Sequence, residues 1–284
     1  MITLKSDREF EKMAVAGACV AAVHEAVKAA ARPGTTLKEL DEIAAAIIRD
    51  WDCTPSFLGY QPSPLQPPYP GHLCLSVNDV IVHGIPSAYR LRSGDLLSVD
   101  AGAIYEGFHG DAAFSVGVGE VSSEAARLIQ ATEEAMWAGI FQIAPGHRIG
   151  DIGAAVEEVG HRHGLGIVRE YVGHGIGRQM HEEPQVSNLG IPGRGLRIKT
   201  GMALCIEPMF NLGSWETRVD EDRWTVRTAD GSLSAHFEHT VGVTRRGTKI
   251  MTMSAKPVDL VDLAGDKYHF RPVFGAHNVT EAAP

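Results

Sequence analysis

Apolar residues recur at helical spacing in four segments of the chain. The first segment follows Ser6, which forms a capping-box pattern with Glu9, and its helix is expected to end near ARPG at 31–34. The second follows Thr36, which forms the same pattern with Glu39. Two further helices are predicted at about 122–143 and about 149–163. The pattern therefore predicts two pairs of helices.

Short apolar runs suited to β-strands lie between and after these helices. They are LCLSVN, DLLSVDAGAIY and GDAAFSVGVG before the second helix pair, and MALCIEPMF, RWTVRT and SAHFEHTVGVT after it. Residues 55–71 are rich in proline, which suits neither a helix interior nor a central strand. We predict a loop there, and its length points to a function. The periodicity is lost after about residue 253, so 253–284 is expected to be a C-terminal tail.

Three short sequence matches occur in the same order in the two parts of the chain. PGTTLKEL at 33 resembles PGHRIGDI at 145, HGI at 83 recurs at 174, and SGDLLSVD at 93 resembles TGMALCIE at 200. Chance similarity is the alternative, but similar offsets in one order favour two homologous halves. We therefore predict one α+β domain over residues 1–252, with pseudo-symmetric halves at about 1–120 and 121–252 and a site between them.

Composition and charge narrow the class of protein. The net charge of −9 argues against nucleic-acid binding, because a surface that binds phosphates needs an excess of Lys and Arg. We find neither a run of eighteen apolar residues nor a signal pattern at the start, so we expect a cytoplasmic protein without a membrane segment. The four cysteines lie far apart without CxxC spacing, which favours free, mostly buried thiols.

Acidic residues accompany the apolar strands. Asp100 in the first half takes the place of Glu207 in the second, and each ends an apolar strand where a lone carboxylate is costly. If the hairpin turn lies between residues 105 and 106, Asp100 faces Asp111 directly. A register shift of two residues makes them diagonal neighbours on the same face. A surface hairpin with solvated acids gives the same pattern, but a buried pair needs a cation.

Glu238 lies in another apolar strand and is the second-half candidate to partner Glu207. Together with Asp100 and Asp111 these carboxylates carry a charge of −4, which two divalent cations would neutralise. His174 would complete a ligand set rich in oxygen, which suits Mn, Fe or Co better than a thiolate-rich site does. Two such ions can hold a bridging hydroxide and polarise a carbonyl, the arrangement used by aminopeptidases and phosphatases.

Six motifs resemble, in order, those of the type I methionine aminopeptidases. They are VNDVIVHGIP, LLSVDAG, HGDAAFSVGVG, GHGIGRQMHEEP, IEPM and FEHTVGVT, and the resemblance runs from about residue 3 to residue 252. It implies the pita-bread fold, a pseudo-twofold antiparallel sheet with flanking helices. It also implies two divalent metal ions (Mn, Fe, Co or Zn) and removal of the initiator methionine when the second residue is small. The implied partners are nascent polypeptide N-termini, which such an enzyme can meet at the ribosome, and we expect a monomer.

The resemblance assigns a role to each matching residue. It implies a set of five metal ligands, namely Asp100, Asp111, His174, Glu207 and Glu238. Glu207 would also move the proton of the attacking water, His181 would contact the scissile carbonyl, and His83 would bind the substrate backbone near the leaving nitrogen. The methionine pocket would be formed by Phe57, Tyr60, Cys74, Met180 and Trp224. Glu182 and Glu183, in contrast, are not expected to be ligands.

Two features of the chain depart from this family pattern. The segment 61–70 is longer and richer in proline, which leaves open whether Tyr69 serves as the second pocket tyrosine, and the tail after 253 exceeds the typical end.

The position of Trp224 in the sequence gives a separate reason to place it near the site. We expect the Asp230–Gly231 turn to fold its strand back beside Glu238.

Other functions fit the sequence less well. An aminopeptidase P or prolidase usually carries a domain ahead of the catalytic pattern, which starts here almost at once, and a type II enzyme would carry a helical insertion between the His174 and Glu207 motifs. A metal-free binding protein on the same fold would have lost ligand positions that are all present. A phosphate-binding loop at GHGIGR would need a following Lys-Ser/Thr and a βαβ context, and it has neither.

Overall fold

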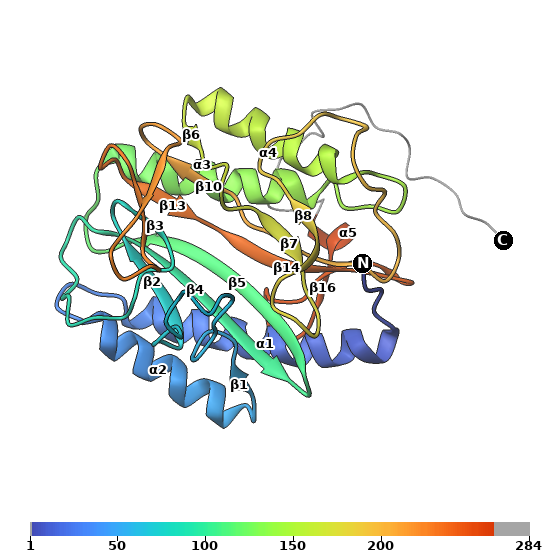
Figure 1. The fold of residues 1–284 in the computed structure, drawn as a ribbon, viewed down its shortest axis with the longest axis horizontal. Helices are drawn as coiled ribbons and strands as arrows, with labels where there is room; N and C mark the ends of the chain where they lie inside the picture. The colour runs from blue at the N-terminus through green and yellow to red at the C-terminus, as the bar shows by residue number, and fades with distance from the viewer. Residues whose placement is uncertain (1, 264–284) are drawn as a thin grey trace.

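A computed structural model describes residues 2–263, and Figure 1 shows how their elements are arranged. Helix α1 (Asp7–Ala30) begins at Ser6 and α2 (Leu37–Asp50) begins at Thr36, each with both hydrogen bonds of the predicted capping box. Helices α3 (Ser123–Ile140) and α4 (Ile149–His163) follow. The four helix predictions are therefore confirmed to within a few residues. The part of the predicted tail at 264–284 lies outside the described residues.

The strands form one large antiparallel sheet and two small ones. The path of the large sheet is β1 (Thr54–Pro55), β4 (Leu96–Tyr105), β5 (Phe108–Gly117), β14 (Glu238–Thr244), β9 (Ala203–Ile206), β7 (Gly173–Gly175) and β8 (Glu182–Val186). Strand β2 (Leu73–Val77) also pairs with β4, β15 (Gly247–Ile250) with β14, and β16 (Val258–Asp259) with β15. A short helix, α5 (Leu260–Leu263), follows β16.

The small sheets flank the large one. One consists of β13 (Ser234–His236), β10 (Met209–Asn211) and β6 (Gly166–Ile167), and the other of β11 (Thr217–Val219), β12 (Val226–Thr228) and β3 (Val80–Val82). Figure 1 shows α1 and α2 on the side of β4 and β5, and α3 and α4 on the side of β10 and β13. Each helix pair thus lies beside a different group of strands.

Alternation along the central strands separates the core from the opposite face of the sheet. In β4, residues 97, 99, 101 and 103 belong to the main apolar core, which also contains residues of α1, α2 and α3. Asp100 therefore emerges on the other face. Helix α1 packs closely on β5, because a Cβ atom on Gly110 of β5 would lie only 2.7 Å from the backbone nitrogen of Gly17 in α1. Packing of the helices thus leaves the opposite face of the sheet available for a site.

Helix α1 is the one helix within residues 2–263 that is long and apolar enough to cross a membrane, judged by length and composition alone. Its buried side chains include Phe10, Met13 and Val20, and the helix contacts β4, β5 and α2. Packing against the sheet accounts for its apolar character.

The β4–β5 hairpin decides between the two predicted registers. Asp100 pairs with Ala113 and Gly102 with Asp111, so the two aspartates are diagonal neighbours and direct opposition is wrong. The physical reason lies in the turn, where Glu106 and Gly107 both have positive φ angles. A two-residue turn of this kind matches the twist of the strands and centres the hairpin one residue later than direct opposition requires.

The prediction that the strand after Trp224 folds back beside Glu238 is also wrong. Strand β12 pairs with β11 and β3, whereas β13 pairs with β10. The Asp230 side chain accepts hydrogen bonds from the backbone nitrogens of Ser214 and Ser232, at 2.7 and 3.0 Å. These bonds tie the turn to a distant loop, so the chain enters a different sheet after the turn.

Candidate metal centre

Three carboxylates meet on the face of the central strands that lies opposite the apolar core. Asp100 of β4 and Glu238 of β14 both pair with Ala113 of β5, so they lie on either side of a small residue. Asp111 lies two residues along β5 and therefore points to the same face. One oxygen atom from each of the three carboxylates lies within 4.8 Å of the others. The sheet register alone thus brings three acids together.

Glu207 and His174 extend this cluster. Because His239 pairs with Ile206, the next pair in the same register brings Glu207 beside Glu238. The Nε2 atom of His174 lies 3.3 Å from Oε1 of Glu207. Its Nδ1 atom lies 2.9 Å from the carbonyl oxygen of Gly175, which fixes a proton on Nδ1 and leaves the lone pair of Nε2 for a ligand.

The acids of the cluster are held in an environment that opposes their ionisation. Burial, followed by the charges of neighbouring acids, raises the pKa values of Asp100, Glu207 and Glu238 well above their ordinary range. Burial raises the pKa of Asp111 to about 7. One oxygen each of Asp100, Asp111 and Glu238 is buried without a hydrogen-bond partner in the described chain. Buried carboxylates without partners fit a cation, which supplies the missing charge.

Cys205 is a neighbour of the cluster but a poor ligand. One atom each of His174, Cys205 and Glu238 lies within 4.8 Å of the others. Burial and the charges of Glu238 and Asp111 raise the pKa of the Cys205 thiol well above its ordinary range. Because thiols bind metals as thiolates, this raised pKa disfavours the ligand form of Cys205 in the metal-free chain. All four cysteines are free and buried, as predicted.

A cavity of about 450 Å³ opens beside the cluster. It is lined by every residue that the sequence singled out for the site, namely Phe57, Tyr60, Cys74, His83, Asp100, Asp111, His174, Met180, His181, Glu207, Trp224 and Glu238. Tyr69 belongs to the same lining. Its ring contacts those of Trp224 and Phe57 edge-on, with centroid distances of 5.1 and 6.5 Å. The cavity thus joins an acidic wall to an apolar pocket.

Two histidines, His181 and His83, line the cavity together with the acidic wall and the pocket. His181 has its ring centroid 4.4 Å from that of His174, and its Nδ1 atom lies 2.8 Å from the hydroxyl of Tyr60. His83 directly follows β3 and has a left-handed backbone with φ of 60°. Such a conformation costs a residue with a side chain about 1 kcal/mol or more and is common at functional sites. Burial lowers the pKa of His83 to about 4, so its ring is neutral near pH 7.

Comparison with known proteins identifies this arrangement. The model of metallopeptidase family M24 matches residues 11–245. The chain belongs to this family. It is 48% identical to methionine aminopeptidase 1 of Mycobacterium tuberculosis over 89% of the chain and 96% of the relative. It is 42% identical to methionine aminopeptidase 1 of Bacillus subtilis over 89% of the chain and 99% of that relative.

Solved structures give the same answer for the fold. A methionine aminopeptidase from Thermotoga maritima superposes with a TM-score of 0.85 at 40% identity, covering 89% of this chain and 99% of that one. A prolidase from Pyrococcus furiosus has a TM-score of 0.70 at 20% identity, covering 88% of this chain and 65% of that one, and shows a shared fold alone. The predicted pita-bread fold and the resemblance to the methionine aminopeptidases are confirmed, and the chain is a metal-dependent hydrolase of family M24.

This M24 metallopeptidase has a cavity residue that the sequence analysis missed. His236 lines the cavity, and its Nε2 atom lies 3.9 Å from Oε2 of Glu207. Burial lowers the pKa of His236 to about 3, so the ring is neutral. Its position two residues before Glu238 in a strand-like run was a usable signal, because alternate residues share a face.

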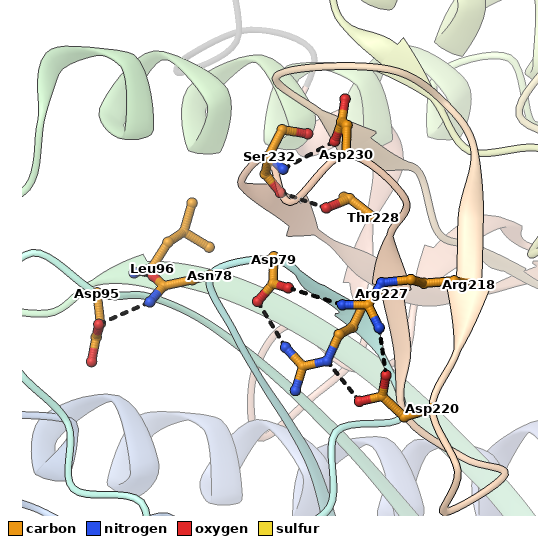
Figure 2. A network of polar contacts seen from close by, with 10 residues as sticks. All are labelled: Asn78, Asp79, Asp95, Leu96, Arg218, Asp220, Arg227, Thr228, Asp230 and Ser232. Carbon is orange, nitrogen blue, oxygen red and sulfur yellow. Dashed lines mark hydrogen bonds and ion pairs between the residues drawn. The ribbon is translucent and has the colours of Figure 1, made fainter.

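A network of charged side chains supports the wall that carries His83 and Trp224, and Figure 2 shows it. Nε of Arg227 donates to Asp220 at 2.6 Å, and its Nη1 donates to Asp79 at 2.8 Å. Asp79 directly precedes β3, whereas Arg227 lies in β12. The network therefore fixes the two strands that lead to the cavity.

The two adjacent glutamates of the motif GHGIGRQMHEEP do not line the cavity. Oε2 of Glu182 accepts a hydrogen bond from Nζ of Lys5 at 2.7 Å and another from the hydroxyl of Thr3. Lys5 is almost fully buried in this ion pair. Glu182 thus anchors the N-terminal segment to the strand after His181.

Proposed function

We propose that this M24 metallopeptidase removes the N-terminal methionine from nascent polypeptides whose second residue is small, with residues 1–252 as its catalytic domain. One observation carries the proposal: a single cavity joins the acidic and histidine cluster to a pocket of buried apolar side chains. The side chains of this pocket are Phe57, Tyr69, Cys74, Met180 and Trp224. Sulfur and aromatic groups suit the flexible thioether of methionine.

The cluster has the composition of a dinuclear site. Asp100, Asp111, His174, Glu207 and Glu238 would hold two divalent cations, drawn from Mn, Fe, Co and Zn. The four carboxylates, once ionised, balance the charge of two such cations. When bound, the cations would lower the pKa of a water molecule and polarise the scissile carbonyl.

The remaining residues of the site would position the substrate and move protons. If the hydroxyl of Tyr60 donates to Nδ1 of His181, the neutral ring carries its proton on Nε2. That N–H group could then donate a hydrogen bond to the scissile carbonyl oxygen as this oxygen gains negative charge. Glu207, whose pKa is raised, would take the proton of the attacking water and deliver it to the leaving amine. Neutral His83 would hydrogen-bond the substrate backbone beside the leaving nitrogen.

The cellular setting follows from the same proposal. The substrates would be new N-termini in the cytoplasm, met at the ribosome or soon after synthesis. We propose that the enzyme acts as a monomer.

The decisive experiment compares the peptides Met-Ala-Ser and Gly-Pro-Ala. We expect release of free methionine from the first peptide, loss of this activity with EDTA, and recovery when Mn²⁺ is added back. Turnover of the proline peptide alone would instead assign a prolidase-like activity. Turnover of neither peptide with Mn²⁺, Fe²⁺, Co²⁺ or Zn²⁺ would favour a binding protein that has lost catalysis.

A further inference from the structure

The proline-rich segment 61–68 is a loop that is closed at its base. The backbone nitrogen of Gly59 donates to the carbonyl of Tyr69 at 2.8 Å, and the nitrogen of Tyr69 donates to the carbonyl of Tyr60 at 2.9 Å. Tyr60 and Tyr69 both line the cavity. Compact loops whose ends meet in this way are often functional. This loop therefore rises directly from the wall of the methionine pocket.

The tip of the loop is fixed to the opposite wall by reciprocal hydrogen bonds. Nε2 of Gln66 donates to the carbonyl of Arg223 at 3.0 Å, and Nη1 of Arg223 donates to the carbonyl of Leu65 at 2.6 Å. Nε1 of Trp224 donates to the carbonyl of Pro67 at 2.9 Å. Arg223 has a left-handed backbone with φ of 65°, a conformation that persists only where the surroundings hold it. The loop is thus held in one position over the cavity.

The loop forms part of the solvent-exposed rim of the cavity. The side chains that form the apolar pocket are buried, whereas Pro62 is exposed and Gln66 is half-buried, and both line the same cavity. On the proposed function, the methionine side chain fills the buried pocket and its carbonyl meets the acidic cluster. The rest of the peptide then extends towards the exposed rim, where the loop offers Pro62 and Gln66 on one side.

We propose that Pro62 and Gln66 are specificity-determining residues that contact the third and following residues of the substrate. This inference rests on the proposed function. Oε1 of Gln66 accepts no hydrogen bond from residues 2–263, so it is free to accept one from a peptide N–H group. The ring of Pro62 offers an apolar surface beside it. The loop therefore recognises an extended peptide backbone and favours longer peptides over dipeptides.

The test compares Met-Ala-amide, which ends before the loop, with the tetrapeptide Met-Ala-Ser-Ala in the Mn²⁺-loaded enzyme. The test variants are Gln66→Ala and Arg223→Gly. Glycine at position 223 tolerates the left-handed backbone and keeps the carbonyl that accepts from Gln66. We expect each variant to lower kcat/KM for the tetrapeptide by about fivefold, through KM, as for the loss of one hydrogen bond. Turnover of Met-Ala-amide should change by less than about twofold. Leu65→Ala is the matched control, because that side chain is 79% exposed.

The outcomes separate this inference from the proposed function. Equal losses on both substrates, or no loss on the tetrapeptide, would overturn the role of the loop while leaving the peptidase intact. Failure of the unchanged enzyme to cleave either substrate would overturn the proposed function and this inference with it. Thermal unfolding of each variant shows whether the fold is kept. The two substitutions remove different contacts of the same loop, so one unstable variant does not decide the result.

Discussion

Ionisation of Asp111 should destabilise the metal-free protein as the pH rises from 4 to 8. Its pKa is about 7 in the folded chain, against 3.8 for a solvated aspartate, because its carboxylate is buried. A raised folded pKa means that stability is fully present below pH 3.8 and is lost as the pH rises through 7. Each pH unit between these values costs about 1.4 kcal/mol, so the total from Asp111 is about 4 kcal/mol.

Buried histidines act in the opposite direction at acidic pH. Burial lowers the pKa of His24 to about 3 and that of His239 to about 4, so the folded chain loses stability as the pH falls below about 6.5. The net pH dependence of one protein is therefore a sum of opposing effects. A comparison between two proteins that share these histidines removes their contribution.

Asp111→Asn provides that comparison, because asparagine keeps the shape of the protonated acid without its charge. Urea unfolding of the EDTA-treated proteins should show the unchanged protein losing at least about 3 kcal/mol relative to the variant between pH 4.5 and 7.5. Loss of this charge also eases ionisation of Asp100, Glu207 and Glu238, whose pKa values it raises. Mn²⁺ should restore stability at pH 7.5 to the unchanged protein more than to the variant.

Asp50→Asn, at the exposed end of α2, is the control for the loss of a negative charge. It should leave the pH dependence of the free energy of unfolding as it is in the unchanged protein. Parallel pH curves for the unchanged protein and Asp111→Asn would refute the argument, because they would show that Asp111 ionises without cost in the folded chain.

Four further changes test other parts of the structure. Asp100→Asn should abolish peptidase activity while circular dichroism shows an intact fold; full activity would contradict the ligand assignment. His181→Ala should lower kcat by about a hundredfold with little change in KM, and an unchanged kcat would remove this ring from the chemistry. Arg227→Met should lower the free energy of unfolding by about 1–2 kcal/mol, because two partly buried carboxylates lose a partner. The more exposed Arg218 of the same network is the comparison, and an equal loss for Arg218→Met would refute this. Gly17→Ala should cost about 2 kcal/mol or more, because its Cβ would lie 2.2 Å from the carbonyl oxygen of Met251, and an unchanged Tm would contradict this packing.

The helices and the central strands could be predicted because their signals are local. The capping boxes at Ser6 and Thr36 and the apolar periodicity placed α1 and α2 almost to the residue. The clustering of Asp100 and Asp111 also followed from a short hairpin, although the turn residues fixed the register. The metal-ligand roles stay a prediction, since the proximity of these side chains does not itself show a bound ion.

What the sequence did not predict depends on contacts between distant segments. The pairing of β12 with β3 and the ion pair between Asp79 and Arg227 join residues nearly 150 positions apart, for which no periodic signal exists. The place of Tyr69 in the pocket was left open because an irregular, proline-rich loop precedes it. His236 could have been found from the same apolar run as Glu238, although the structure divides that run between β13 and β14 at Phe237.

The closed base between Tyr60 and Tyr69 separates the length of the loop from the shape of the pocket. Because the two ends are bonded to each other, residues can be added or removed beyond them without displacing either tyrosine. Doubling the length of a flexible loop costs only about 0.6 kcal/mol, and a longer form of this loop would in addition lose bonds that fix its tip to Arg223 and Trp224. Segment 61–68 can therefore vary between generations of the enzyme without moving Tyr60 or Tyr69, provided that its residue 67 still offers a carbonyl to Nε1 of Trp224 in the pocket.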